Sequence, residues 1–140
     1  MTFRTQVRFN VEVRRLRPAP TSDAPVDQAR LIRAICDKLG QLPPAMINVL
    51  VLAADGASSA DALAQAMLWL QDRATNKDEL VFQQRGFTGA RDFLRHYQRL
   101  SGALWLAHES SAREIALWRN PWARHPLPAD LAKALSNTVP

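Results

Sequence analysis

Residues 103–118 read ALWLAHESSAREIALW, and this stretch decides the fold prediction. Two runs rich in β-forming residues, 103–108 and 113–118, flank the polar segment 109–112, as in a β-hairpin. Folding the chain about the centre of that segment pairs apolar residues on one face: Leu106 with Ile115, and Leu104 with Leu117. The other face then carries Trp105, Ala107, Ala116 and Trp118. Because both faces are apolar, we expect another element to cover each of them.

A second, longer strand is predicted close to the start of the chain. Apolar or β-forming residues alternate along one side of residues 3–13: Phe3, Thr5, Val7, Phe9, Val11 and Val13. The arginine-rich other side suits either contact with a nucleic-acid backbone or the solubility of an edge strand. The apolar side needs a partner surface, and the hairpin offers one within the chain or in a second copy. Residues Phe3, Val7, Phe9, Val11 and Val13 are therefore candidates for contact with a homodimer or protein partner.

Helical periodicity dominates the middle of the chain. The predicted helices are 26–39, 45–54, 58–73, a short piece ending at Gly86, 88–100 capped by Thr88, and 128–136. We expect 45–54 to be a short buried helix, although its β-branched residues leave a strand possible. The predicted organisation is thus an N-terminal strand over 1–17, a Pro-rich linker over 18–25, a domain over 26–120, and a tail over 121–140 with one short helix.

Composition limits the chemistry that the chain offers. It has 140 residues, of which 47% are hydrophobic and 22% charged, as expected for one globular domain. The lone Cys36 excludes an intramolecular disulfide, and the histidines lack the spacing of metal ligands. We expect no signal peptide, no membrane span, no metal and no cofactor, and no group of residues resembles a catalytic site. The sequence therefore predicts a cytoplasmic protein that is not an enzyme.

Positive charge is concentrated in two parts of the chain. The net charge is +5, with +4 in residues 1–17, −3 in 18–80 and +3 in 81–101. Fifteen of the 18 basic residues are arginine, which suits bidentate contact with phosphate or guanine. A weaker basic patch lies in the tail at Arg119, Arg124 and His125. This distribution permits a polyanionic partner.

The predicted helix 88–100 has two contrasting faces. Phe93, Tyr97 and Leu100 share one face and are expected to pack on the core. The opposite arc carries polar groups that can contact base edges or phosphate: Arg91, Arg95, Gln98 and Arg99. The alternative is the solvated face of an ordinary surface helix.

Three helices followed at once by a hairpin form an order that resembles the winged helix-turn-helix superfamily over residues 45–118. The resemblance implies that helix 88–100 enters the major groove and that hairpin 103–118 is the wing, with His108 and Arg113 on the DNA backbone. About thirty residues separate Ser58 from Thr88, whereas the family joins its second and third helices tightly.

These observations lead to one leading expectation and two alternatives. The fold class is α+β: a helical domain with a winged-helix-like C-terminal hairpin and a long N-terminal strand. The expected function is that of a small regulator or accessory factor that binds duplex DNA as a dimer. The main alternative is a non-enzymatic protein-interaction module or a small subunit of a larger assembly, and RNA binding is a third option.

Overall fold

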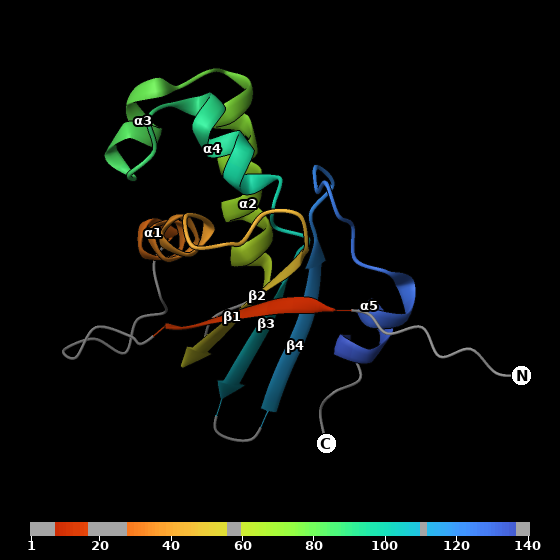
Figure 1. Cartoon of the computed structure of the whole chain (residues 1–140). Coiled ribbons are helices and arrows are strands. Elements are labelled where there is room, and N and C mark those ends of the chain that lie inside the picture. The colour runs from red at the N-terminus through yellow and green to blue at the C-terminus, as the bar shows by residue number, and fades with distance from the viewer. Residues whose placement is uncertain (1–7, 17–27, 56–59, 110–111, 137–140) are drawn as a thin grey trace, which may run out of the picture.

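The structure, a computed structural model, describes residues 8–16, 28–55, 60–109 and 112–136. It has the expected α+β class, with helices and one sheet (Figure 1). The elements run in the order β1 (Phe9–Leu16), α1 (Gln28–Leu39), β2 (Ile47–Asp55), α2 (Ala60–Thr75), α3 (Glu79–Gln84), α4 (Ala90–Tyr97), β3 (Gly102–Glu109), β4 (Ala112–Arg119) and α5 (Ala129–Ser136).

Within the described residues, the sheet has four strands in the order β1-β2-β3-β4. The first three strands are parallel, and β4 pairs with β3 antiparallel. The predicted hairpin is confirmed together with its register, since Leu104 pairs with Leu117 and Leu106 with Ile115. The hairpin therefore completes a larger sheet, in which β3 lies between β2 and β4.

The prediction of a helix over 45–54 is wrong, because this segment forms β2. Leu50, Leu52 and Val49 are all almost fully buried, so both faces of the strand are covered. A strand buried on both faces reads as a continuous apolar run rather than as an alternating one. The β-branched residues were the signal that favoured the strand.

The predicted N-terminal strand exists, but its partner differs from the expected one. β1 pairs with β2 in parallel, with Val11 opposite Val49, and not with the hairpin. Within the chain, the expected packing on the hairpin is therefore wrong, because β1 pairs with β2, the segment that had been predicted as a helix. Packing on a second copy of the chain stays a prediction. Phe3 and Val7, like the linker 18–25, lie outside the described residues.

The winged-helix arrangement is not confirmed. A strand replaces the first of the three helices that the resemblance needs, and the hairpin is part of the central sheet. The other predicted helices are present as α1, α2, α3, α4 and α5.

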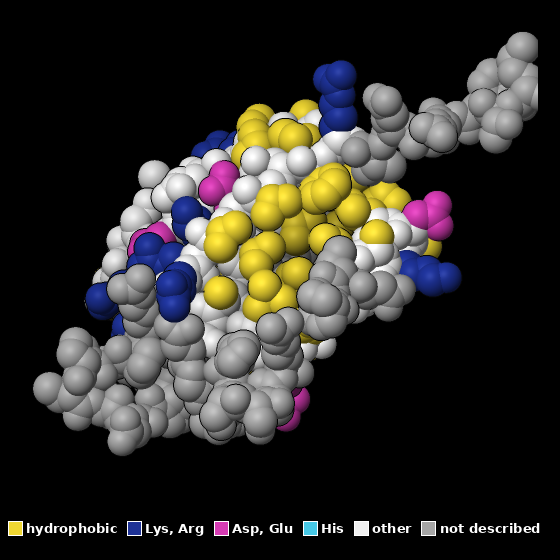
Figure 2. Space-filling model, turned by 90° about the horizontal axis from the view of Figure 1, so that it is seen from below, with side chains coloured by type: hydrophobic (Ala, Val, Ile, Leu, Met, Phe, Trp, Pro, Cys, Tyr) yellow, Lys and Arg dark blue, Asp and Glu magenta, His cyan; other side chains and the backbone are white. Residues whose placement is uncertain are grey.

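The two faces of the sheet are covered unequally. Helices α1 to α4 lie over one face and enclose the main core, which includes Leu52, Trp105 and Phe93 (Figure 1). On the other face, α5 covers a smaller cluster around Val49 and leaves hydrophobic side chains open (Figure 2). Val11 and Val13 of β1 belong to this open face and are 44% and 57% exposed.

Candidate functional site

Helix α4, which carries Arg91 and Arg95 of the predicted site, is held at its N-terminus by two carboxylates. The Ala90 amide donates to Oε2 of Glu79 on α3 at 3.2 Å, and the Thr88 amide donates to Oδ2 of Asp92 at 3.0 Å. The N-cap residue is Gly89, so the prediction that Thr88 caps this helix is wrong. The side chain that caps the helix comes instead from Glu79 on the preceding helix α3. A local sequence pattern does not reveal such a contact.

The C-terminus of α4 is held by the segment that follows β4. Nδ2 of Asn120 donates to the carbonyls of Tyr97 and Leu100 at 2.9 and 2.8 Å. The Arg124 amide donates to the Gln98 carbonyl at 2.9 Å. The helix ends at Tyr97 rather than at Leu100, and the carbonyls of Tyr97, Gln98 and Leu100 accept these bonds from outside the helix.

Buried polar residues join this segment to the start of the parallel strands. Asn48 at the start of β2 accepts the Ser101 amide at 2.9 Å and donates its own amide to Oγ of Ser101 at 3.1 Å. The Ser101 hydroxyl donates to the His125 carbonyl at 2.5 Å. We call residues 120–128 the arm. The hydrogen bonds of Asn48, Ser101 and Asn120 join α4, the starts of β2 and β3, and the arm into one unit. This unit fixes the position of the surface residues above it.

A basic hollow of about 260 Å³ opens on this unit. It is lined by Pro44, Ala45, Arg95, Arg99, Arg124 and His125, with no acid among these residues. Ala45 adopts the left-handed conformation, with φ of 60°. A second hollow of about 230 Å³ shares Arg95 and adds Arg91, Thr88 and Asp92. We call Arg91, Arg95, Arg99, Arg124 and His125 together the α4 basic strip.

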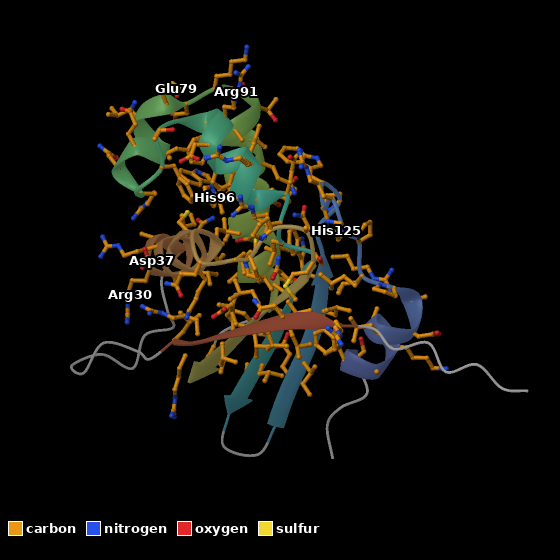
Figure 3. All side chains as sticks on the ribbon, viewed as in Figure 1. Arg30, Asp37, Glu79, Arg91, His96 and His125 are labelled. Atoms are coloured by element: carbon orange, nitrogen blue, oxygen red, sulfur yellow. The ribbon has the colours of Figure 1, made fainter. Side chains whose placement is uncertain are left out.

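The arginines of the strip differ in how firmly they are held. Arg95 forms an ion pair with Asp92, with Nη2 and Oδ1 2.5 Å apart. Nη1 of Arg99 donates to the Leu42 carbonyl at 3.2 Å, which orients that guanidinium beside the hollow. Bonding from the Thr88 amide, and then from Arg95, lowers the pKa of Asp92 below its ordinary value. Arg91 is exposed at the far end of the strip (Figure 3).

The structure brings only part of the predicted site together. Arg91, Arg95 and Arg99 share the strip, whereas Gln98 lies just beyond the helix end and is half-buried. His108 and Arg113 pair across β3 and β4 at the hairpin end, opposite the end where α4 lies (Figure 1). Seven residue steps of strand separate Gly102 from Glu109, roughly 23 Å. The α4 strip and the hairpin tip are therefore two separate surfaces.

The arm supplies the residues that sequence analysis placed apart from the site. Arg124 and His125 were predicted as a weaker patch in the tail, yet they line the same hollow as Arg95 and Arg99. The sequence signal that could have linked these two residues to the site was the group of basic residues in the tail. The buried Asn48 and Asn120 that bring the arm to α4 had no signal in the sequence, because isolated asparagines are common in turns.

Other reactive groups belong to the core. Burial raises the pKa of the Cys36 thiol to about 12, although Arg85 opposes the shift. Cys36 is only 3% exposed, so this thiol is part of the core. Within the described ranges, no group of three or more His, Cys, Asp or Glu residues could hold a metal ion. No helix in this part of the chain is long and apolar enough to cross a membrane.

Comparison with known proteins found no relative of this chain. No protein-family model, no curated protein and no solved structure matches it.

Proposed function

We propose that the protein binds duplex DNA through the α4 basic strip, as a small regulator or accessory factor without enzymatic activity. The observation that carries the proposal is the hollow around which Arg95, Arg99, Arg124 and His125 converge from two distant segments of the chain. Convergent arginines suit phosphate oxygens, which they bind with paired hydrogen bonds. A scaffold of buried hydrogen bonds supports these side chains and lowers the ordering cost of binding.

The contact would involve the side and the C-terminal half of α4. Glu79 and Asp92 already occupy the amides at its N-terminus, so a phosphate would not bind there. Helix α4 has eight residues and is about 12 Å long, which is comparable with the width of the major groove. Exposed Arg91 and Arg95 would reach base edges or phosphate, while Arg99 and Arg124 would hold the backbone.

His108 and Arg113 are left out of the proposed contact. They lie at the hairpin end of the sheet, so a duplex on the strip would need to extend along β3 to reach them. The cytoplasmic location expected from the sequence remains part of the proposal.

The test is fluorescence anisotropy with random-sequence duplex DNA, titrated from about 50 to 200 mM salt. We expect Arg91→Ala and Arg124→Ala each to weaken binding and to reduce the salt slope by about 1. Lys133→Ala, on exposed α5, removes the same charge away from the strip and should bind like the wild type. Absence of binding at 50 mM salt, or equal affinity in all variants, would overturn the proposal.

The open sheet face favours a second candidate function, association with another copy of the chain. Val11 and Val13 are exposed beside one another on a β1 edge that has no neighbouring strand within the described residues. Such an edge and face suit pairing with a second strand.

Sedimentation equilibrium tests this second candidate. We expect Val13→Lys to weaken self-association at least tenfold, because the lysine would lie inside the new interface. Leu80→Lys, at an exposed apolar position on α3, is the matched control and should leave self-association unchanged. A wild-type protein that is monomeric at every concentration would exclude the dimer.

A further inference from the structure

We infer that two copies of the chain associate through β1 in one antiparallel register, with Val13 of each copy opposite Val13 of the other. In this register, Glu12 of each copy lies opposite Arg14 of the second copy. The inference rests on the self-association proposed above, to which it adds the register and the charged residues that select it. It does not depend on DNA binding.

The side chains of β1 alternate between the two faces of the sheet. Phe9 packs against the smaller cluster beneath α5, so the odd-numbered residues of β1, which include the two exposed valines, face that side. Leu16 belongs to the main core, so the even-numbered residues face helices α1 to α4. Glu12 agrees with this assignment, since its Oε2 lies 3.7 Å from Nζ of Lys38 on α1. A residue that pairs across a new strand must lie on the same face as its partner.

Two-fold symmetry limits how two copies of β1 can pair. β1 has one neighbouring strand within the described residues, and two edge strands that a two-fold axis joins into one sheet run antiparallel. Because partners share a face, the axis passes between two copies of the same residue. Val11 and Val13 are 44% and 57% exposed, whereas Phe9 and Asn10 are half-buried. The exposed side chains of β1 therefore lie between residues 11 and 15.

Charge selects one register among those centred in this exposed stretch. An axis at residue 12, 14 or 15 would place a charged side chain directly opposite its own copy. An axis at Val11 would place Arg8 opposite Arg14. The axis at Val13 instead places Glu12 opposite Arg14 twice, once on each side of the axis. Opposite charges in facing positions stabilise strand pairing and like charges oppose it, so the register centred on Val13 is favoured.

One register outside the exposed stretch also pairs opposite charges. An axis at Asn10 would place Glu12 opposite Arg8, but it would centre the interface on a half-buried residue and not on the exposed valines. Burial of exposed apolar side chains and new backbone hydrogen bonds supply the affinity of such a contact. The register that centres on Val13 therefore combines charge pairing with the most exposed apolar residue of the strand.

The surroundings of Glu12 leave room for a second cation. Asn10 Nδ2 is 3.4 Å from Glu12 Oε1, a weak contact, and Lys38 lies near the other carboxylate oxygen. Because paired residues share a face, helices α1 to α4 of both copies would lie on one side of the joined sheet. The open apolar faces of the two copies would then form one continuous face on the other side (Figure 2).

Disulfide cross-linking measures the register directly. In Val13→Cys the two new cysteines would face each other with Cβ atoms about 4.5–5.5 Å apart, close to the separation that a disulfide spans. We therefore expect a covalent dimer under mild oxidation. Val11→Cys is the matched control, because its two copies would be four residue steps apart, roughly 13 Å, too far for a disulfide. Wild-type protein controls for Cys36, which is buried.

Charge reversal tests the Glu12–Arg14 pair, with sedimentation equilibrium as the measurement. Arg14→Glu and Glu12→Arg should each weaken self-association at least fivefold, because like charges then face one another. The double variant should recover most of the lost affinity, since the two charges have only exchanged places. Arg119→Glu makes the same charge change at an exposed position on the opposite edge strand β4 and should associate like the wild type. Thermal unfolding checks that each variant is folded, above all Glu12→Arg, which also loses the contact with Lys38.

The outcomes separate the register from self-association itself. A wild type that is monomeric at every concentration would overturn both. A wild-type dimer that does not cross-link through Val13→Cys, or that keeps its affinity in folded Arg14→Glu, would overturn the register alone. Cross-linking through Val13→Cys but not Val11→Cys, together with recovery in the double variant, supports it. The α4 strip is tested separately by Arg91→Ala and Arg124→Ala.

Discussion

The two ends of the sheet both carry arginine clusters, but the chain builds them differently. At the start of the parallel strands, the α4 strip rests on a network of buried side-chain hydrogen bonds through Asn48, Ser101 and Asn120. At the other end, a hollow between β1 and α1, here called the β1–α1 hollow, is lined by exposed arginines. Arg14 and Arg15 lie near the end of the edge strand β1, and Arg30 and Arg33 lie in the first turns of α1. The comparison shows that buried residues of the core hold the α4 strip in place, whereas the arginines between β1 and α1 lie on the surface of the molecule.

Replacing Gly102 should have the largest effect on stability, because Gly102 lies at the end of the sheet that the buried hydrogen-bond network holds. A Cβ at this position would lie 2.8 Å from the Trp118 carbonyl oxygen and 2.5 Å from Cδ1 of Leu127. The carbonyl belongs to the paired strand and cannot move without disturbing the ladder. We expect Gly102→Ala to lower the free energy of unfolding by about 3 kcal/mol in urea titrations. Gly40→Ala is the control, because a Cβ there would have only one neighbouring atom, at 3.9 Å, so the free energy of unfolding should change little. Equal losses in the two variants would contradict the claim that the start of β3 is too closely packed for a Cβ.

Removing the Asn120 side chain tests the hydrogen bonds of the network. Asn120 is 5% exposed, donates to two carbonyls and accepts the Trp122 amide at 2.9 Å. Asn120→Ala leaves these groups without their partner, so we expect a loss of about 2 kcal/mol in unfolding free energy. Asn10→Ala is the control, since Asn10 makes one weak contact with Glu12 at 3.4 Å and is less buried. A loss below 0.5 kcal/mol for Asn120→Ala, on the order of a surface change, would show that the arm does not depend on this residue.

Acid should weaken the N-terminus of α4 through Asp92. The pKa of Asp92 is lowered in the folded state, so its contribution to stability is present above its ordinary pKa of 3.8 and is lost as pH falls through the folded value. We expect the wild type to lose more unfolding free energy between pH 5 and about pH 2 than Asp92→Asn does. Urea unfolding across this range measures the difference. Asp130→Asn, an exposed change on α5, is the control, and identical pH profiles for Asp92→Asn and the wild type would exclude the proposed role.

The smallest effect on stability is expected at the end of the sheet that carries the β1–α1 hollow. Arg33 is exposed on α1, so Arg33→Ala should change the unfolding free energy by no more than about 0.5 kcal/mol. Thermal unfolding measures this change, with Ile35→Ala on the same helix as the buried contrast. A large loss in Arg33→Ala would show that the β1–α1 hollow is a structural element and would remove the contrast between the two ends.

Local patterns predicted the elements better than their pairing. The hairpin register followed from alternation over residues 103–118, and the confirmed helices followed from periodicity near 3.6 residues. The prediction for segment 45–54 failed because burial on both faces of a strand removes the alternation of apolar and polar residues. Without a strand at this position, the parallel pairing of β1 and β3 with β2 could not be predicted. Once 45–54 is a strand, a crossover through α1 is the natural connection.

The candidate site was predictable only over one local segment, the predicted helix 88–100, which includes Arg99 beyond the end of α4. Arg91 and Arg95 followed from the two contrasting faces of α4. The contribution of Arg124 depends on Asn120 and Ser101, which join residues more than 19 positions apart in the chain. Single-sequence reasoning has no measure of such distant hydrogen bonds, so the arm was expected to lie apart from the site.

The pairing of Asn48 with Ser101 across 53 residues also sets an order of folding. The β3–β4 hairpin closes between neighbouring residues, a microsecond event, whereas the β2–β3 ladder forms only after the chain containing α2, α3 and α4 has closed into a loop. Because loop-closure entropy opposes this step, we expect pairing of β2 with β3 to be slower than closure of the β3–β4 hairpin. We therefore expect the basic hollow at the start of these strands to form after the hairpin.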